Sequence, residues 1–462
     1  MKVKNNKLTL RLGSAILSLI LAFSVITPMP VFSDNTGFAE TYVYAATKKP
    51  TYTINASSKP YFKNWAKYKT YNKYSKHWYL FRSYMERFEK TGGGTLIVKK
   101  GTYYLPISVQ VPSNVTIKFQ NGVVVKKISK TGTSKLHKNG PMFQLIAPSK
   151  YNKTNAVSNY NGTKNVSFIG SGTVKFQMNK VKGDCCIIMA QNQNVTFKNI
   201  SFLNCGGHFF ELDASKKVTI DACKFSNITN TDKTCEAINL DTPDSKTGGF
   251  SFRWSKKDKK PNVGVTIKNC TFTNMNRAIG THKYSQVNGK NVMHQNITIS
   301  NNVFNKMRGF EGAIMTYNWK NVTISGNTFK GLGIEDKTFA IAALSVVSAN
   351  VKNNNIENFA NTIIFRRGFV SSGYTDPQAL SLTDAQIDML ITNQYKYDTV
   401  VTGDAQYTEN PYWASGKMIY YPLTVYGAPE VVEPGDEPEE PENPDNPDNP
   451  DNPDQSNDIN QG

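Results

Sequence analysis

The stretch that decides the fold is Gly264-Val-Thr-Ile-Lys-Asn-Cys-Thr-Phe (264–272), because close variants of it recur along the chain. The variants begin at Asn114, Asn165, Asn194, Lys217, Asn296 and Asn321. Their shortest spacings are 23 residues (194 to 217) and 25 residues (296 to 321), and longer spacings of 29, 32 and 47 residues indicate insertions. Each variant alternates apolar and polar residues over a β-branched run, which is typical of a short strand.

The repeat predicts a solenoid of stacked coils. A coil of two or three short strands cannot bury its own apolar face, whereas stacked coils bury a continuous core. The sixth residue after the starts at 194, 217, 264, 296 and 321 is Ile200, Cys223, Cys270, Asn302 and Asn327, which predicts an internal column that is apolar in one part and Asn in another. We therefore interpret Cys223 and Cys270 as buried thiols, and the six cysteines show no metal-ligand spacing.

The first coil carries a resemblance to a known family. Gly92-Gly-Gly-Thr-Leu-Ile-Val-Lys-Lys-Gly-Thr-Tyr (92–103) resembles the opening coil of the pectin-lyase-like superfamily, which includes polygalacturonases and pectate lyases, and the resemblance covers about residues 90 to 370. The helical spacing of apolar residues from His77 to Glu89 is similar to the helix that caps such solenoids, where an open β edge would invite aggregation. The resemblance implies an all-β, single-stranded, right-handed parallel β-helix with an N-terminal capping helix. The active-site patterns of polygalacturonases and pectate lyases are not matched, and fold alone does not carry function.

The two ends of the chain differ from the repeats. Basic residues, the apolar run Ala15–Ile26 and a small-residue site at Tyr44-Ala45-Ala46 predict a signal peptide over 1–46, and an uncleaved anchor is the alternative. We expect the N-terminal segment, capping helix and first coil over 47–110, the β-helix over 111–370, and a C-terminal capping segment over 371–429. Residues 430–462 form an acidic Pro/Asn/Asp-rich tail that cannot bury a core and is expected to be disordered.

Charge predicts the class of partner. The leader holds 4 basic and 2 acidic residues and the tail holds 12 acidic residues, so the body retains 50 basic and 21 acidic residues, a net charge of +29. Such a field attracts polyanions. We expect the chain to be secreted and extracellular, with no membrane contact after signal cleavage. Its expected partner is an anionic polysaccharide, with a cell-wall association and no nucleic acid. We expect the protein to be a monomer. A basic surface with no particular partner is the alternative.

A second strand precedes each repeat, and aligning these strands places polar residues on one outer face. The inward pairs are Ile187/Met189, Phe210/Leu212, Ile238/Leu240, Ile279/Thr281 and Ile314/Thr316. Because strand side chains alternate, three neighbouring coils should present His208, Glu211, Asp213, Glu236, Asn239, Asp241, Arg277 and His282 outward. Asp213 and Asp241 would lie roughly 5 Å apart, close enough for one pKa to rise. Solvated surface charges are the simpler interpretation, but eight polar residues on three coils favour a site.

Insertions follow the charged strands directly, after Leu240 and after Thr281. The first insertion contains Arg253 and Trp254, and aromatic rings stack on sugars while cations pair with carboxylates. We predict that the substrate is bound by Asn239, Lys283, Tyr317, Asn318, Trp254 and Arg253.

Three functions fit this face. We favour hydrolysis of glycosidic bonds in a polyuronate-like polysaccharide, with Asp213 and Asp241 as the carboxyl pair and Glu211 or Glu236 as alternates. His208 and His282 would assist proton transfer and Arg277 would neutralise a substrate carboxylate. In a lyase, Arg277, Lys283 or His282 would be the base that abstracts a proton from the substrate, and the carboxylates would hold Ca²⁺. Apart from this Ca²⁺, the sequence identifies no metal and no cofactor. A non-catalytic wall-binding adhesin is the third possibility.

Overall fold

The computed structural model describes residues 49–179, 181, 185–228, 235–281, 283–309, 312–332, 339–344, 346–357, 359, 361–366, 395–402, 409–414 and 417–422. The predicted signal peptide, the acidic tail and His282 lie outside the described residues. Contacts divide the chain into 1–49 and 50–462, and the fold described below is that of the second unit.

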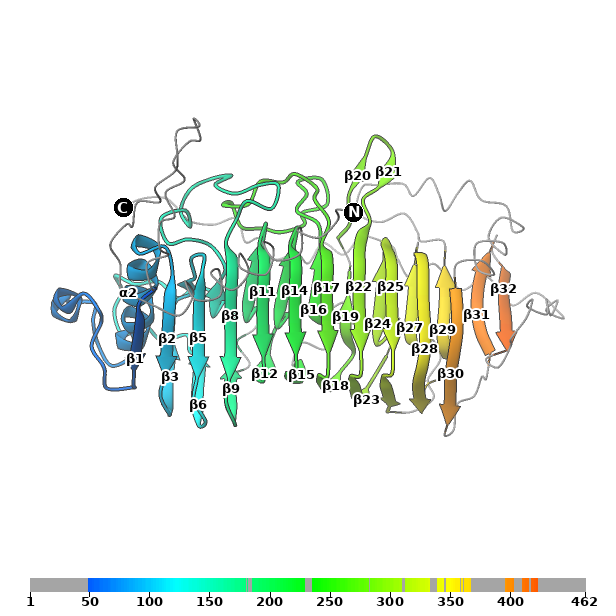
Figure 1. Ribbon diagram of the computed structural model, residues 1–462, viewed down its shortest axis with the longest axis horizontal. Coiled ribbons are helices and arrows are strands. Elements are labelled where there is room, and N and C mark those ends of the chain that lie inside the picture. The colour runs from blue at the N-terminus through cyan, green and yellow to red at the C-terminus, as the bar shows by residue number, and fades with distance from the viewer. Residues whose placement is uncertain are drawn as a thin grey trace, which may run out of the picture. The chain divides into compact units, whose positions relative to one another are not determined.

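The unit is a parallel β-helix in which each coil contributes strands to three faces (Figure 1). The first face contains β1 (Thr51–Ile54), β2 (Gly94–Val98), β5 (Val115–Phe119), β8 (Lys164–Gly170), β11 (Gln193–Lys198), β14 (Lys216–Asp221), β17 (Val263–Lys268), β22 (His294–Ser300), β25 (Trp319–Ser325), β28 (Val347–Glu357) and β30 (Tyr395–Thr402). The second contains β3 (Gly101–Leu105), β6 (Val123–Lys127), β9 (Val174–Gln177), β12 (Ser201–Cys205), β15 (Lys224–Ile228), β18 (Thr271–Met275), β23 (Val303–Met307) and β26 (Thr328–Gly331). Because β28 pairs with strands of both, these two faces form one 19-stranded sheet.

The third face is a separate 11-stranded sheet. It contains β4 (Val109–Gln110), β7 (Phe143–Gln144), β10 (Ile187–Ala190), β13 (Phe210–Asp213), β16 (Glu236–Asp241), β19 (Arg277–Gly280), β24 (Ile314–Tyr317), β27 (Phe339–Leu344), β29 (Asn361–Arg366), β31 (Glu409–Ala414) and β32 (Lys417–Pro422). Its pairings are parallel up to β31, which pairs antiparallel with β32. The predicted all-β, right-handed parallel β-helix is confirmed.

The residue that starts each repeat turns a corner of the coil. Asn114, Asn165, Asn194, Asn296 and Asn321 have φ between 53° and 61°, and Lys217 and Gly264 have φ of 54° and 71°. Asn tolerates this left-handed conformation better than most residues, and Gly does so at no steric cost. Asparagine side chains also join successive coils, since Asn165 and Asn194 each donate over 2.8 Å to the Asn one coil earlier.

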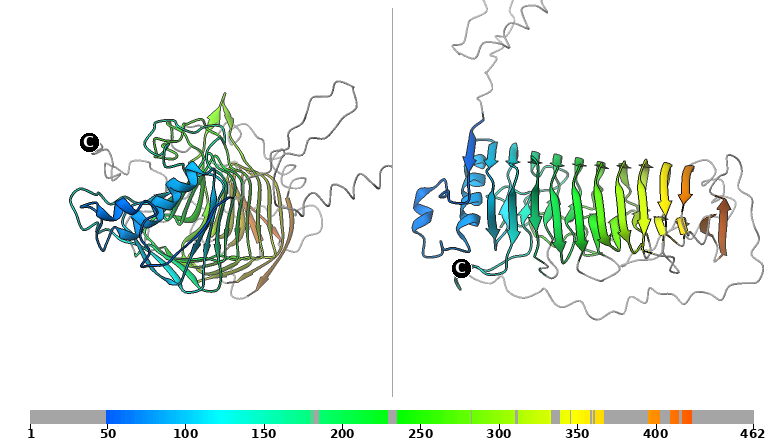
Figure 2. Two further views of the ribbon diagram at one scale, coloured as in Figure 1. Left: turned by 60° about the vertical axis from the view of Figure 1, so that its left-hand side comes forward. Right: turned by 90° about the horizontal axis from the view of Figure 1, so that it is seen from below.

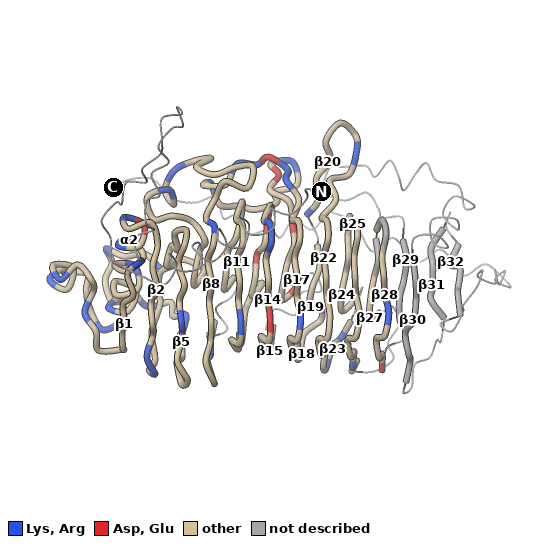
Figure 3. The backbone as a smooth tube through the Cα atoms, viewed as in Figure 1, with Lys and Arg blue, Asp and Glu red and all other residues tan. Residues whose placement is uncertain are grey.

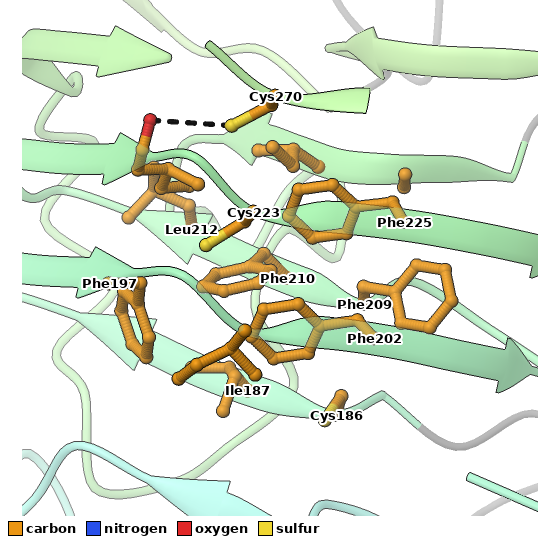
Figure 4. Packing of buried hydrophobic residues seen from close by; sticks show 14 of the residues in the cluster. Cys186, Ile187, Phe197, Phe202, Phe209, Phe210, Leu212, Cys223, Phe225 and Cys270 are labelled. Atoms are coloured by element: carbon orange, nitrogen blue, oxygen red, sulfur yellow. Dashed lines mark hydrogen bonds between the residues drawn. The ribbon is translucent and has the colours of Figure 1, made fainter. Parts of the chain in front are cut away.

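The core is a set of stacked columns (Figure 4). Phe202, Phe225 and Phe272 stack nearly parallel, with ring centroids 5.1 and 4.9 Å apart. Cys223 and Cys270 are buried thiols, as predicted, and the Cys270 thiol donates to the Ile220 carbonyl over 3.6 Å. Burial raises the pKa of the Cys270 thiol well above its ordinary value, which keeps it protonated and unreactive.

The internal column changes from apolar to polar where the sequence predicts it. Asn302 and Asn327 are buried, and Asn302 donates to the Asn327 side-chain oxygen over 3.0 Å. Asn327 in turn donates to Asn354 over 2.9 Å and to the Ile299 carbonyl over 3.0 Å. Each buried amide is therefore paired, as buried polar groups require.

A helix covers the N-terminal end of the stack (Figure 2). This helix, α2 (Lys76–Lys90), buries Trp78, Leu80, Phe81, Met85 and Phe88 in the same core as the coils. The Trp78 indole donates to the Ser108 carbonyl over 3.1 Å. A short 3-10 helix, η1 (Lys63–Lys67), precedes α2. No helix among the described residues is long and apolar enough to span a membrane.

Candidate functional site

The charged residues lie in register on the outer side of β13, β16 and β19. Glu211 pairs with Asn239 and Asp213 pairs with Asp241 across β13 and β16, and Glu236 pairs with Arg277 across β16 and β19. These are the pairings predicted from the sequence. We call the set His208, Glu211, Asp213, Glu236, Asn239, Asp241 and Arg277 the charged strip. Figure 3 shows acidic residues concentrated in these middle coils, while Lys and Arg spread over the rest of the described body.

Apolar clusters bound the charged strip on both sides. On the preceding coils, Ile188 and Ala190 of β10 pack with Phe250 and Trp254 from the first insertion. On the following coils, Met315 and Tyr317 of β24 pack with Tyr284 from the second insertion and with Phe339 and Ala342 of β27. The polar part of the third face is therefore confined to about three coils.

The first insertion, residues 242–262, is fastened to the preceding coils. Trp254 is 1% exposed, and its indole donates to Gln144 over 3.1 Å. Backbone bonds join the insertion to the segment between β7 and β8, with Val157 donating to Trp254 and Lys256 donating to Val157. The prediction that Trp254 stacks on a sugar is wrong for this conformation, because packing covers its ring. Arg253 is exposed, as a binding residue would be.

The second insertion, which carries the hairpin of β20 (Gln286–Val287) and β21 (Lys290–Asn291), is tied to the first one. Thr242 donates its backbone N–H to the Lys283 carbonyl over 3.2 Å, and the Thr242 and Ser285 hydroxyls lie 2.8 Å apart. The backbone N–H of Lys283 donates to the Asp241 carboxylate over 2.9 Å. This loop therefore orients Asp241 through a main-chain bond.

Asp213 is the most perturbed acid of the charged strip. Its side chain is completely buried, neither carboxylate oxygen accepts a hydrogen bond from a donor among the described residues, and the Glu211 carboxylate is its hydrogen-bonding neighbour. Burial, followed by the negative charges of Glu211 and Asp241, raises the pKa of Asp213 well above its ordinary range. Lys257 of the first insertion opposes this rise, and burial lowers the pKa of Lys257. Burial and the neighbouring negative charges thus favour the protonated form of Asp213.

Glu211 and His208 are the acid and imidazole that solvent reaches, each with 14% of its side chain exposed. The Asn239 amide donates to both Glu211 oxygens, over 3.2 and 3.3 Å. His208 Nδ1 donates to the Glu236 carbonyl over 2.8 Å, and its Nε2 lies 3.9 Å from Glu211. The Asn239 amide therefore fixes the orientation of Glu211, which lies beside Asp213 on the same strand face.

Other predicted site residues are occupied by structural contacts. The Arg277 guanidinium lies 2.6 Å from Glu236, and both side chains are buried. The predicted use of Arg277 against a substrate carboxylate is therefore wrong, since its charge is already matched inside the protein. Tyr317 is 2% exposed and packs edge-on against Tyr284 at 4.9 Å. Asn318 is buried and accepts a bond from Asn291 over 3.1 Å, so neither residue offers a binding surface.

Two residues near the charged strip were not singled out from the sequence. Lys257 was one of several lysines in the first insertion, and its proximity to Asp213 depends on how that insertion folds. His294 begins β22 and is buried, and burial lowers its pKa to about 4. His294 Nδ1 accepts the Asn262 backbone N–H over 2.9 Å, so the ring is neutral and structural. Strand alternation from the inward Ile297 would have placed His294 outward, but Asn296 between them has a φ of 56° and interrupts the alternation, so the sequence pattern gave no signal for this buried ring.

The arrangement suits proton transfer more than metal binding. Within the described ranges, no group of three or more His, Cys, Asp or Glu side chains is placed to hold a metal ion. A protonated carboxyl beside an ionised carboxylate can donate a proton at one atom while the other polarises water or attacks carbon.

Comparison with known proteins supports the fold. No protein-family model matches the chain, and no curated protein matches it. Among solved structures, the chain is similar to the Streptococcus pneumoniae surface protein and adhesin PfbA, with 17% identity and a TM-score of 0.52, over 72% of this chain and 82% of that one. A second PfbA structure aligns with 14% identity and a TM-score of 0.48, over 77% and 94%. The tailspike of E. coli bacteriophage HK620 aligns with 14% identity and a TM-score of 0.40, over 64% and 60%. The first similarity bears on the β-helix fold alone.

Proposed function

We propose that the protein hydrolyses glycosidic bonds in an acidic polysaccharide outside the cell, at the charged strip. The observation that carries this proposal is the completely buried carboxyl of Asp213, which has no hydrogen-bond donor among the described residues and lies beside Glu211 and Asp241. A buried carboxyl without a hydrogen-bond partner costs stability. Such a group is common where a pKa is tuned for catalysis.

In this proposal, Asp213 is the general acid that protonates the leaving-group oxygen. Glu211 is the ionised partner, since it is the acid of the charged strip that solvent reaches and Asn239 holds its orientation. Asp241 keeps a proton on Asp213 by adding negative charge next to it. Lys257 and Lys283, both partly exposed, would meet carboxylates of the substrate.

The charge of the body supports an acidic substrate. A net charge of +29 over residues 47–429 attracts a polyanion over long range. The sequence of residues 1–46 supports secretion, and residues 430–462 would extend the chain from a cell wall. The pectin-lyase-like resemblance is consistent with a polyuronate.

Binding without cleavage is the second candidate. It is favoured by the complete burial of Asp213 and Asp241, which a substrate cannot touch unless the first insertion moves. PfbA is described as a surface adhesin, and an adhesin would keep the face closed.

The test is an incubation of the protein with polyuronates and neutral glycans, following reducing ends and the ultraviolet absorbance of unsaturated uronates together. We expect reducing ends without absorbance, and loss of at least about 100-fold in rate for Asp213→Asn and for Glu211→Gln. Asp221→Asn is the matched control, because Asp221 lies on the first face and pairs with Lys198 at 3.4 Å. Absorbance would indicate a lyase. Binding with no cleavage of any polymer, unaffected by these substitutions, would reject the proposal in favour of the adhesin.

A further inference from the structure

The segment on the outside of the N-terminal cap is strongly basic. Residues 49–85 contain eight Lys or Arg and no Asp or Glu. Six of the lysines are exposed: Lys49, Lys59, Lys63, Lys67, Lys69 and Lys73. Figure 3 shows these cations at the end of the stack that α2 covers, several coils from the charged strip. We call residues 59–74 the cap surface.

Aromatic rings alternate with these lysines. Tyr68 is 44% exposed, and it stacks on the half-buried Trp65 with centroids 6.3 Å apart. Trp65 and Trp78 hold the Arg82 guanidinium between them, at 5.2 and 5.0 Å from their centroids. Lys73 and Lys130 lie 5.3 and 4.9 Å from the Tyr74 ring. The cap surface therefore presents flat rings and positive charges side by side.

The cap surface is ordered before any ligand binds. Tyr68 donates its N–H to the Trp65 carbonyl over 3.2 Å, and Tyr71 donates to Tyr68 over 2.8 Å. The Asn72 side chain accepts the Tyr74 N–H over 2.9 Å and donates to the Thr131 carbonyl over 3.0 Å. An ordered surface loses little conformational entropy on binding.

The role of this segment as a cap over the end of the β-helix explains its inward-facing aromatic rings. It does not explain its exposed lysines. The apolar side of α2 already closes the core, and the Tyr79 ring supports Trp65 and Tyr68 at 5.9 Å each. The lysines are exposed and like charges repel, and the first acid that follows them in the sequence, Glu86, is already bound to Arg82 at 2.8 Å. A counter-charge supplied by a ligand would relieve that repulsion.

We propose that the cap surface is a second binding site for an acidic polysaccharide, separate from the charged strip. Lysine ammonium groups would pair with uronate carboxylates along the polymer, and the exposed Tyr68 ring, supported by Trp65, would stack on the apolar face of a sugar ring. This site would hold one polymer to the end of the stack while the middle coils act on it. It does not depend on cleavage at the charged strip, so either proposal stands if the other fails.

The experiment measures retention of the full chain on immobilised polygalacturonate in a salt gradient. The test variant is Lys63→Glu/Lys67→Glu/Lys69→Glu, and the control is Lys175→Glu/Lys224→Glu/Lys320→Glu, which removes the same charge from exposed strand positions. We expect the cap variant to bind at least about tenfold more weakly at low salt and the control to change less than about threefold, because screening confines charge effects to about 10 Å. Thermal melting checks that each variant is folded.

A charge-neutral variant, Tyr68→Ala, separates stacking from ion exchange. It should weaken polygalacturonate binding severalfold and leave retention on an inert sulfated resin unchanged. Equal losses for the two triple variants would overturn the proposal, as would an unchanged Tyr68→Ala protein. Tighter retention on double-stranded DNA than on polygalacturonate would also overturn it.

Discussion

Asp213→Asn should change how stability depends on pH, and the size of the change follows from linkage. The folded protein holds a proton on Asp213 at pH values where the unfolded chain has lost it, because burial and neighbouring carboxylates raise the folded pKa. The contribution of this proton to the free energy of unfolding is fully present below the ordinary Asp pKa of about 4. It is lost as the pH rises toward the pKa of Asp213 in the folded protein.

One proton bound only in the folded state gives a slope of about 1.4 kcal/mol for each pH unit. The wild-type free energy of unfolding should therefore fall by about that amount per unit, relative to Asp213→Asn, from about pH 4 up to the raised pKa. Beyond that pKa the difference should become constant. Asparagine is nearly isosteric and carries no charge, so the variant lacks this slope.

The assay is urea denaturation followed by tryptophan fluorescence at unit intervals from pH 4 to pH 8, with equal m-values required of both proteins. Asp221→Asn is a control for which the pH dependence of the free energy of unfolding should have the opposite sign. Burial tends to raise the Asp221 pKa, but hydrogen bonds from Asn269 and Lys198 lower it overall, so its contribution is lost as pH falls. A wild-type minus Asp213→Asn difference that stays flat across this range would refute a proton held on Asp213.

Other predictions concern the stack itself. Asn327→Ala removes the acceptor of the buried Asn302 N–H, at 2.9 Å, and should lower the free energy of unfolding by about 2–4 kcal/mol in the same urea assay. Lys217→Asn replaces a lysine at φ 54° with a residue that tolerates this conformation, and scanning calorimetry should show a stabilisation of about 1 kcal/mol. Gly280→Ala would place a Cβ 2.9 Å from the Arg277 Cδ and displace the buried ion pair, which should cost about 1–3 kcal/mol. An unchanged unfolding curve for that variant would show that the ion pair moves aside without cost.

Much of the fold follows from the sequence because parallel stacking repeats one pattern. The spacing of Val-Thr-Ile runs identified the coils, and alternation within the preceding strand gave the pairing of Glu211 with Asn239 and of Asp213 with Asp241. The same reasoning identified the internal column that contains Asn302. Each of these inferences uses neighbours along a strand or one coil away.

The surroundings of the site could not be predicted from the sequence. The alternation of side chains along a strand shows which way each one points, but it does not show what covers that side chain. Trp254 appeared to be a binding residue, but its insertion folds back on β10 and buries it. Arg277 appeared available for substrate, but Gly280 leaves room for its side chain to lie against Glu236. Contacts between insertions that are distant in sequence are not encoded in any repeat.

Three long connections leave the stack at one corner, between the third face and the first. They follow β7, β16 and β19, and their ends return to the stack at β8, β17 and β22. As a result Val157 and Ser255, almost a hundred positions apart in the chain, form a bridge. The connections from β10 to β11, from β13 to β14 and from β24 to β25 at the same corner are short, and the parallel pairing of the strands is the same beside long and short connections. Long and short connections therefore leave the stack from the same corner, and insertions of different length are accommodated there without a change in the strand register of the scaffold.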